Sequence, residues 1–347
     1  MESSVFPITL IVVVVLVILP FIVRLARNAW SVSRWWEVER ARHASALKPI
    51  PPVAVWTQPP GGSPAGSSSA RQETKELAEP GKSLGPADPR RIGRYRLLRR
   101  LGEGGFGTVF LGIDGTGRRV AIKMILPEYV ADSDRRERFR REAARAKRVP
   151  LHSTAEVLDF DDGPRPYLVT EFIDGPTLTS YVRSNGPMRG SDLEQLAISV
   201  ATALKAIHSA GIIHRDLKPA NVLLSATGAR VIDFGISWAL DASSDVSRGT
   251  TKAGTYGYMA PEQFDDRPVS VKTDVFAWGA LVAFAGTGAP PFGGGSAPAV
   301  MNRTLEKDPV LTGLDSRLMP LVLRALEKDP RRRPEVDGLL AVLNRAR

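Results

Sequence analysis

Residues 213–221 read Ile213-His214-Arg215-Asp216-Leu217-Lys218-Pro219-Ala220-Asn221, and residues 231–235 read Val231-Ile232-Asp233-Phe234-Gly235. The first stretch is a polar loop with a carboxylate, a lysine and an amide, and the second places another carboxylate after an apolar strand. The oxygens of Asn221 and Asp233 are ligands that Mg²⁺ prefers. Asp216 is then free to accept a hydroxyl proton, which is the division of labour that phosphoryl transfer requires.

A glycine-rich stretch lies upstream and reads Leu101-Gly102-Glu103-Gly104-Gly105-Phe106-Gly107-Thr108-Val109. In a dinucleotide-binding unit such glycines open a helix, but β-branched and aromatic residues follow here, which favours a hairpin between two strands. Glycines allow backbone N–H groups to approach phosphates closely. For this motif alone, a purely structural hairpin stays open as the alternative.

The following strand-like segment, Val120-Ala121-Ile122-Lys123, places a lysine among apolar neighbours and within reach of a bound polyphosphate. That lysine needs an acidic partner. A helix expected over about residues 134–149 offers Glu142, one of two carboxylates in its body among eight basic residues. Either carboxylate could instead serve an intrahelical pair worth about 0.2–0.5 kcal/mol. Spacing alone therefore does not select Glu142.

In this order the motifs resemble the catalytic core of the protein kinase family, and in particular the bacterial Hanks-type serine/threonine kinases. Ala260-Pro261-Glu262, Asp274 and Arg333 are similar as well. The resemblance covers about residues 94–345 and implies an α+β, bilobal protein-kinase fold with a β-rich small lobe and a helical large lobe. It also implies that Glu262 and Arg333 form a structural ion pair and that Asp274 stabilises residues 213–221, called here the catalytic loop.

The resemblance implies a chemical role for each residue of the catalytic loop. Asp216 would be the catalytic base, and Lys218 would contact the γ-phosphate of ATP. Asn221 and Asp233 would ligate Mg²⁺, for which Mn²⁺ can substitute. Protein substrates with Ser or Thr hydroxyls would receive the phosphate.

The ATP site implied by the resemblance is built mainly by the small lobe. Lys123, paired with Glu142, would hold the α- and β-phosphates, Thr170 would be the gatekeeper, and Glu171 to Ile173 would be the adenine-binding hinge. The complete expected ATP-binding set is Leu101, Gly102, Glu103, Gly104, Gly105, Phe106, Gly107, Val109, Ala121, Lys123, Glu142, Thr170, Glu171, Ile173, Asn221 and Asp233.

An alternative class of function is a catalytically weak kinase fold that acts as a scaffold or ATP sensor. Such proteins commonly lose the strand lysine, the catalytic aspartate or the metal-binding aspartate. Lys123, Asp216 and Asp233 are all present here, which favours an active enzyme.

The segment between Asp233 and Glu262 holds the candidate regulatory phosphosites. The resemblance implies that Arg215 binds a phosphate in this segment, and the best candidates are Thr250 and Thr251, with Ser247 behind them. Thr255 is instead expected near the substrate hydroxyl. Tethering to one membrane would raise the effective concentration of the kinase, so we expect a transient homodimer that autophosphorylates in trans.

The N-terminal region carries an apolar run, residues 5–23, in which sixteen of nineteen residues are Val, Ile, Leu or Phe and none is charged. As a helix it would cover about 28 Å of hydrocarbon. A cleaved signal peptide and a buried core helix are the alternatives, but Glu2 before the run and Arg24 after it favour an uncleaved anchor. Since residues 1–4 carry no Lys or Arg, we expect this short end outside the cell and the kinase domain in the cytoplasm of a single-pass cell-membrane protein.

Two further segments are expected between this span and the kinase core. Residues 24–48 combine Trp30, Trp35 and Trp36 with arginines, which suits binding to anionic membrane lipids. Residues 49–93 are rich in Pro, Gly and Ser, which predicts a linker.

Composition limits the remaining classes of function. The 347 residues are 43% hydrophobic, which allows a substantial buried core and excludes a wholly disordered chain. With no cysteine, disulfides, thiolate zinc sites and thiol nucleophiles are excluded. The net charge of +10, carried by 36 Arg and 11 Lys against 37 acidic residues, favours anionic partners. We expect these to be phosphate and lipid, and no nucleic acid.

Overall fold

The computed structural model describes residues 80–130, 132–150, 153–234, 256–265 and 267–345. The chain divides into two units, Met1–Ala54 and Val55–Arg347, and every described residue belongs to the second unit. The expected span, the juxtamembrane segment and the three phosphosites lie outside the described residues. Among the residues that are described, no helix has both the length and the apolar character needed to cross a membrane.

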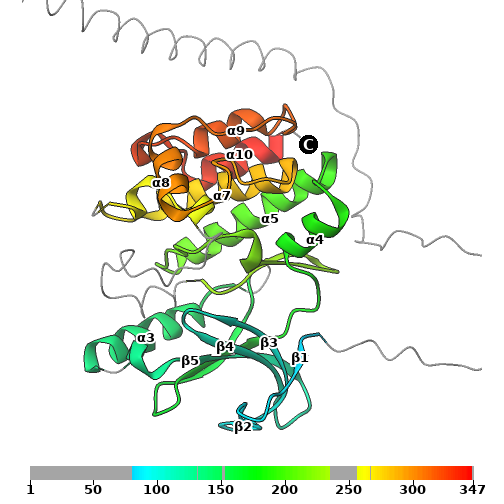
Figure 1. Ribbon diagram of the computed structural model, residues 1–347, viewed down its shortest axis with the longest axis vertical. Helices are drawn as coiled ribbons and strands as arrows, with labels where there is room; N and C mark the ends of the chain where they lie inside the picture. The colour runs from blue at the N-terminus through cyan, green and yellow to red at the C-terminus, as the bar shows by residue number, and fades with distance from the viewer. Residues whose placement is uncertain (1–79, 131, 151–152, 235–255, 266, 346–347) are drawn as a thin grey trace, which may run out of the picture. The chain divides into compact units, whose positions relative to one another are not determined.

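The small lobe is an antiparallel sheet in the strand order β1-β3-β4-β5-β7-β6, with β2 also paired to β3 (Figure 1). The strands are β1 (Lys82–Ser83), β2 (Arg91–Ile92), β3 (Tyr95–Gly104), β4 (Gly107–Ile113), β5 (Arg119–Ile125), β6 (Val157–Asp161) and β7 (Tyr167–Glu171). Alternate residues such as Phe110, Val120, Ile122 and Val169 are fully buried in a cluster on one face. The other face is left for the long helix of this lobe and for the site.

That helix is α3 (Ser133–Ala146), which begins where the Asp132 side chain accepts a hydrogen bond from the Arg135 amide. Its buried Phe139 joins a large apolar cluster that includes Ile125 and Leu168 of the sheet and continues into the large lobe. One continuous core therefore connects the two lobes.

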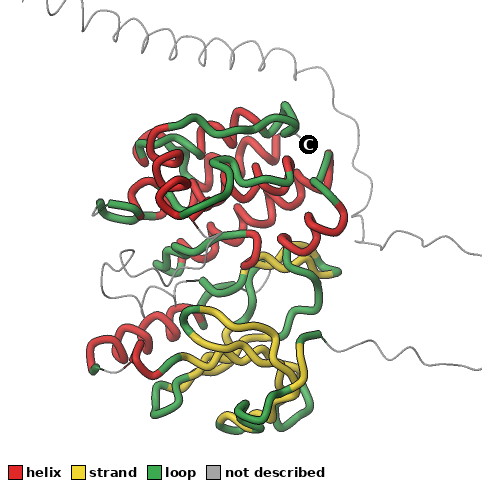
Figure 2. The backbone as a smooth tube through the Cα atoms, viewed as in Figure 1, coloured by secondary structure: helices red, strands yellow, loops and turns green. Residues whose placement is uncertain are grey.

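The large lobe is mainly helical (Figure 2). Its helices are α4 (Leu178–Asn185), α5 (Gly190–Ser209), α7 (Val271–Thr287), α8 (Ala297–Glu306), α9 (Met319–Ala325) and α10 (Val336–Arg345). A two-stranded sheet of β8 (Val222–Ser225) and β9 (Gly228–Val231) lies on the side of the large lobe that faces the small lobe (Figure 1). Short 3₁₀ turns cover Pro127–Val130, Pro219–Asn221, Tyr256–Tyr258, Pro261–Gln263 and Pro330–Arg332.

Helix α7 is the centre of this lobe. It is apolar on all sides and almost entirely buried, and the Trp278 indole N–H donates to the Ala197 carbonyl of α5 over 3.0 Å. Ser270 caps its first turn, and Gly288, with a φ of 83°, ends it in the left-handed conformation that glycine adopts without strain. Helix α5 also packs against α10 and β9, so it links the helical core to the catalytic loop that follows it.

Two expected boundaries differ from the structure. The linker was expected to extend to residue 93, but β1 and β2 fall inside that range and pair with β3, because Ile92 and Leu84 contribute to the small-lobe core. The helix expected to reach residue 149 ends at Ala146, since the chain tightens into i→i+3 hydrogen bonds before Pro150.

Candidate active site

One face of the small-lobe sheet presents the expected adenine and phosphate contacts. Val109 on β4 lies opposite Lys123 on β5, and Ala121 on β5 lies opposite Thr170 on β7. Because side chains alternate along a strand, these four share a face, and all four are only partly buried. The register therefore places these four side chains on one face of the sheet, and the assignment of that face to ATP stays a prediction.

The glycine-rich stretch forms the expected hairpin between β3 and β4, closing at Gly104 and Gly107. At Gly102 a β-carbon would meet no atom within 4 Å, so the loop is open there to a close ligand. Gly107 is different, since its φ is 145° and a β-carbon would lie 1.8 Å from the Met124 carbonyl oxygen. Phe106 packs inward on Tyr129, with ring centroids 5.1 Å apart.

The catalytic loop brings together the three residues that the sequence singled out. The Lys218 ammonium donates to both carboxylate oxygens of Asp216, each over 2.8 Å. The Asn221 amide nitrogen donates to the Asp216 carbonyl over 2.8 Å and to its carboxylate over 3.2 Å. Asp216 is therefore fixed from two sides, while its side chain keeps 22% of its surface exposed.

Asp274 holds this loop from beneath, as expected. Its fully buried carboxylate accepts the backbone N–H groups of His214 and Arg215, each over 2.8 Å. The His208 Nε2 lies 2.7 Å from the same carboxylate. Sequence reasoning did not identify His208, although it lies near the end of the helix that leads into the loop.

Gln263 is a second residue that sequence reasoning missed. Its amide nitrogen donates to the Arg215 carbonyl over 2.9 Å, and its amide oxygen accepts the Ala260 N–H over 2.9 Å. Arg215 has a φ of 65°, a left-handed conformation that costs a non-glycine residue about 1–3 kcal/mol. Asp274 and Gln263 hold the two backbone polar groups of this strained residue. The only signal in the sequence was that Gln263 directly follows Ala260-Pro261-Glu262.

The strand lysine reaches the second carboxylate of the site. The Lys123 ammonium lies 3.0 Å from the Asp233 carboxylate, and the two side chains are 12% and 32% exposed. Burial raises the pKa of Asp233, but the charge and hydrogen bond of Lys123, with smaller effects of His214 and Lys218, outweigh it and hold this pKa below its ordinary value. Asp233 is thus ionised at neutral pH.

The expected pair of Lys123 with Glu142 is not made in this structure. Glu142 is buried and accepts a hydrogen bond from Arg145, one turn along α3, over 2.8 Å. Glu142 also interacts electrostatically with Arg215. Burial lowers the pKa of Arg215 to about 10, although the negative charges of Asp274 and Glu142 act in the opposite direction and raise it. Lys123 and Glu142 thus each pair with another charged residue, Asp233 and Arg145 respectively, because a partly buried ion without a partner costs free energy.

The expected hinge links β7 to α4. Glu171 is the last residue of β7, and its carboxylate accepts the Glu156 N–H over 3.0 Å and pairs with Arg230 on β9. Arg230 also donates to the Thr154 carbonyl over 2.8 Å. Arg230 therefore connects the hinge to the large lobe, and nothing in the sequence marked it for that role.

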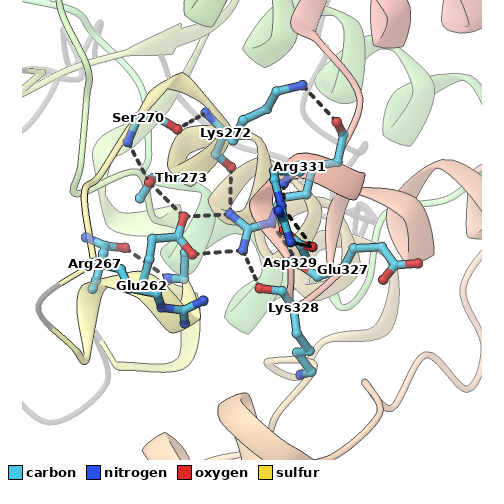
Figure 3. A network of polar contacts seen from close by, with 12 residues as sticks. Glu262, Arg267, Ser270, Lys272, Thr273, Glu327, Lys328, Asp329 and Arg331 are labelled. Carbon is cyan, nitrogen blue, oxygen red and sulfur yellow. Dashed lines mark hydrogen bonds and ion pairs between the residues drawn. The ribbon is translucent and has the colours of Figure 1, made fainter.

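The expected structural ion pair is present in the large lobe. Both Arg333 terminal nitrogens donate to the Glu262 carboxylate, over 2.6 and 2.8 Å, and the two side chains are 0% and 1% exposed. Thr273 donates to the same carboxylate over 2.8 Å, and Figure 3 shows Glu262 and Thr273 meeting in this network. Burial raises the pKa of Glu262, but Arg333 and Thr273 outweigh burial and lower it overall.

Asn221 and Asp233 fit the requirements of a small hard cation. The Asn221 nitrogen faces Asp216, and in the part of the chain that the structure describes its amide oxygen accepts no hydrogen bond. The described residues hold no cluster of three or more His, Cys, Asp or Glu suited to a metal ion. Mg²⁺ typically takes one or two protein ligands and completes its shell with phosphate and water.

Comparison with known proteins agrees with this arrangement. The model of the protein kinase domain family matches residues 95–342. The chain is 44% identical over 262 residues to the probable serine/threonine-protein kinase PkwA of Thermomonospora curvata, covering 75% of this chain and 35% of that protein. It is 37% identical over 253 residues to PknB of Mycobacterium tuberculosis, covering 69% of this chain and 40% of that protein.

A solved structure shows the same fold. The PknI kinase domain of Mycobacterium tuberculosis, crystallised as a point mutant, matches with a TM-score of 0.59 at 25% identity and covers 75% of this chain and 99% of that one. The chain spans 35% and 32% of the length of PkwA and of the Streptomyces coelicolor kinase AfsK. Residues 95–342 nevertheless match the family over most of the chain, which therefore belongs to the protein kinase family and resembles its bacterial Hanks-type serine/threonine members.

Proposed function

We propose that this chain is an active, membrane-anchored serine/threonine kinase that transfers the γ-phosphate of ATP to protein hydroxyls. The observation that carries the proposal is the fixed Asp216 carboxylate, which Lys218 and Asn221 hold while part of its surface stays open. The relatives PkwA, AfsK and PknB are serine/threonine kinases by name, which supports the same acceptor here.

The residues of the site divide the work of phosphoryl transfer. Asp216 accepts the proton of the substrate hydroxyl as that oxygen attacks the γ-phosphorus, while the bond from this phosphorus to the β-phosphate oxygen breaks and ADP leaves. Lys218, 2.8 Å from Asp216, lies where it can also neutralise charge on the transferring group. Asn221 and Asp233 would hold Mg²⁺, which supplies charge neutralisation on the phosphates. The open backbone around Gly102 would cover the phosphates.

The direct test is Asp216→Asn in the full chain, measured as transfer of radiolabelled phosphate from ATP to a protein acceptor. We expect a loss of at least about 100-fold, since general base catalysis contributes about 10²–10⁴. The matched control is Asp337→Asn, which alters a 73% exposed carboxylate paired with Lys205 in the same lobe and is expected to leave activity unchanged. Equal transfer by Asp216→Asn and the wild type would overturn the assignment, and an inactive wild type that binds ATP would favour the scaffold alternative.

We further propose that activation exchanges ion-pair partners. Lys123 now pairs with Asp233, and Glu142 with Arg145. In the active arrangement implied by the family, Lys123 pairs with Glu142, which frees Asp233 for the metal. Phosphate on Thr250 or Thr251 would draw Arg215 toward the segment that precedes Tyr256 and away from the field of Glu142.

Autophosphorylation is tested with the double variant Thr250→Ala and Thr251→Ala. We expect at least tenfold lower activity, which is about 1.4 kcal/mol of lost stabilisation of the active state. Mixing a kinase-dead chain with an active one tests transfer in trans through a transient homodimer. Absence of phosphate from residues 243–255 of the active enzyme, by mass spectrometry, would contradict the proposal.

The membrane location is supported by the apolar run over residues 5–23 and the arginines that follow it. We expect the full chain to sediment with membranes, to resist protease added outside intact cells and to bind anionic vesicles through residues 24–48. The matched control is a chain that begins at residue 49. A mature protein that starts after residue 25 would show that the run is a signal peptide.

A further inference from the structure

The kinase domain is preceded by a segment that folds onto its sheet, residues 80–92, called here the N-terminal strap. The strap lies outside residues 95–342, which match the family. It pairs with β3 twice, at Lys82 and Ser83 through β1 and at Arg91 and Ile92 through β2. Its Leu84 and Ile92 side chains add to the small-lobe core.

The first of these pairings holds β3 immediately before the glycine-rich loop. Lys82 lies opposite Arg100, and Ser83 lies opposite Arg99, one and two residues before Leu101. The Arg99 side chain donates to the Gly81 carbonyl over 2.8 and 3.1 Å. A β-carbon on Gly81, where φ is 94°, would lie 2.5 Å from the Arg100 carbonyl oxygen, so the strap approaches the β3 backbone as only glycine allows.

Two ion pairs, Asp88–Arg100 and Arg100–Glu103, connect the strap to the glycine-rich loop. The Asp88 carboxylate accepts the Gly85 N–H over 2.8 Å and lies 3.0 Å from Arg100, with only 9% of its side chain exposed. The other terminal nitrogen of Arg100 lies 3.2 Å from Glu103. Glu103 lies between Gly102 and Gly104, so the second of these ion pairs is made by the part of the loop that is expected to cover ATP.

The loop needs such support because its glycines provide little of their own. At Gly102 a β-carbon would meet nothing within 4 Å, and at Gly104 only the Gly107 carbonyl oxygen lies that near, at 3.9 Å. The β4 side of the hairpin is held by Gly107 against Met124 and by Phe106 against Tyr129. On the β3 side the matching support comes from the strap, through Arg99 and Arg100.

We propose that the N-terminal strap positions the glycine-rich loop for ATP, with Asp88 as a positioning residue that acts through Arg100 and Glu103. The inference rests on the proposed role of this loop in covering the nucleotide. A loop held near its bound conformation loses less conformational freedom when ATP binds. The strap therefore controls the affinity for ATP more than the rate of the chemical step.

The test is Asp88→Asn in the full chain, which keeps an oxygen for the Gly85 N–H and removes the charge that faces Arg100. We expect the KM for ATP and the Kd for ATP with Mg²⁺ to rise about fivefold, with kcat within about twofold of the wild type. Asp88→Glu, which restores the charge, should recover most of the affinity. If Asp88 acts through Arg100, adding Arg100→Gln to Asp88→Asn should raise the KM little further.

The matched control is Asp114→Asn, at the opposite end of the β3–β4 ladder. Asp114 accepts hydrogen bonds from the Thr116 and Arg118 amides, over 2.8 and 3.0 Å, and does not contact the loop. We expect its KM and Kd for ATP to match those of the wild type. Unchanged affinity in Asp88→Asn, or an equal rise in Asp114→Asn, would overturn the proposal.

Hydrogen exchange separates this proposal from the proposed function. Without nucleotide, amides 101–108 should exchange faster in Asp88→Asn than in the wild type, and this holds whether or not the chain transfers phosphate. Equal exchange rates would overturn the strap's role even in an active enzyme. Faster exchange in Asp88→Asn than in a wild-type chain that proves inactive would support the strap and contradict only the proposed function.

Discussion

The ion pairs Glu262–Arg333 and Lys123–Asp233 both join residues far apart in the sequence, but they differ in how many hydrogen bonds hold them. Arg333 makes two bonds to Glu262 and also donates to the carbonyls of Glu327 and Lys272, with both side chains of the pair at most 1% exposed. Among the described residues, Lys123 makes a single bond to Asp233, which is 32% exposed.

The difference separates structural from chemical charges. In a buried ion pair such as Glu262–Arg333, called here the saturated pair because hydrogen bonds occupy both side chains, water cannot take the place of a lost partner. Breaking that pair therefore leaves a buried charge without a counter-charge. A pair with one bond and partial exposure can exchange partners at low cost. Glu262 and Arg333 therefore maintain the large lobe, whereas Lys123 and Asp233 can change partners, as their proposed roles toward ATP and a metal require.

The largest expected effect comes from breaking the saturated pair. Glu262→Ala should lower the free energy of unfolding by about 3–5 kcal/mol, because Arg333 stays buried without its counter-charge. Denaturant unfolding of the full chain measures this. The control is Asp265→Ala in the nearby exposed Asp265–Arg267 pair, which should cost less than about 1 kcal/mol. Equal losses in the two variants would contradict the comparison.

Breaking the exchangeable pair should affect activity and spare stability. Lys123→Met should reduce phosphate transfer at least about 100-fold, which corresponds to about 2.7 kcal/mol of transition-state stabilisation. Its free energy of unfolding should fall by less than that of Glu262→Ala, since the Asp233 side chain left behind is 32% exposed, whereas the Arg333 side chain is fully buried. Normal turnover by a folded Lys123→Met enzyme would show that Lys123 has no role in phosphate transfer.

The two ion pairs differ in whether the sequence predicted the correct partner. Glu262 and Arg333 were expected to pair, and they do, because a buried charge in a packed lobe has one available partner. Lys123 was expected to pair with Glu142, and it does not, because α3 offers Arg145 at i+3 and Asp233 lies within reach of the lysine. Sequence motifs identify which charges gather at a site, and local distances decide which of them pair.

The same distinction holds for the fold. The β-branched and aromatic residues after the glycines predicted a hairpin between two strands, and burial of one sheet face fixes the register of those strands. The strap was expected to be linker because residues 49–93 are rich in Pro, Gly and Ser, and strands as short as β1 and β2, of two residues each, leave no periodic pattern in the sequence. Gln263 and Arg230 were missed for a related reason, since a single polar contact between distant segments leaves no local signal.

Acid should weaken the saturated pair. The pKa of Glu262 is lower in the folded chain than its ordinary value of 4.5, so the fold favours the ionised form. Its contribution to stability is therefore complete above pH 4.5 and is lost as the pH falls through the lower folded value. The difference in unfolding free energy between the wild type and Glu262→Gln should shrink below pH 4.5. A difference that stays constant down to about pH 2 would show that the contribution does not depend on ionisation.

The smallest expected effect comes from easing the partner exchange at Glu142. Arg145 is 49% exposed and pairs with Glu142 at i,i+3, an interaction worth about 0.2–0.5 kcal/mol. Arg145→Ala removes that competitor, so Glu142 should pair more often with Lys123. The same energy corresponds to an increase in kcat of up to about twofold, provided that this exchange limits activity.

The matched control is Arg141→Ala on the exposed face of the same helix, where the guanidinium lies 3.6 Å from Glu137 and away from the site. Steady-state rates of both variants, measured before any autophosphorylation, isolate the exchange from activation-segment effects. We expect Arg141→Ala to match the wild type. A lower kcat for Arg145→Ala would mean that Arg145 supports the active arrangement, and the Glu142–Arg145 pair would then belong to the working enzyme.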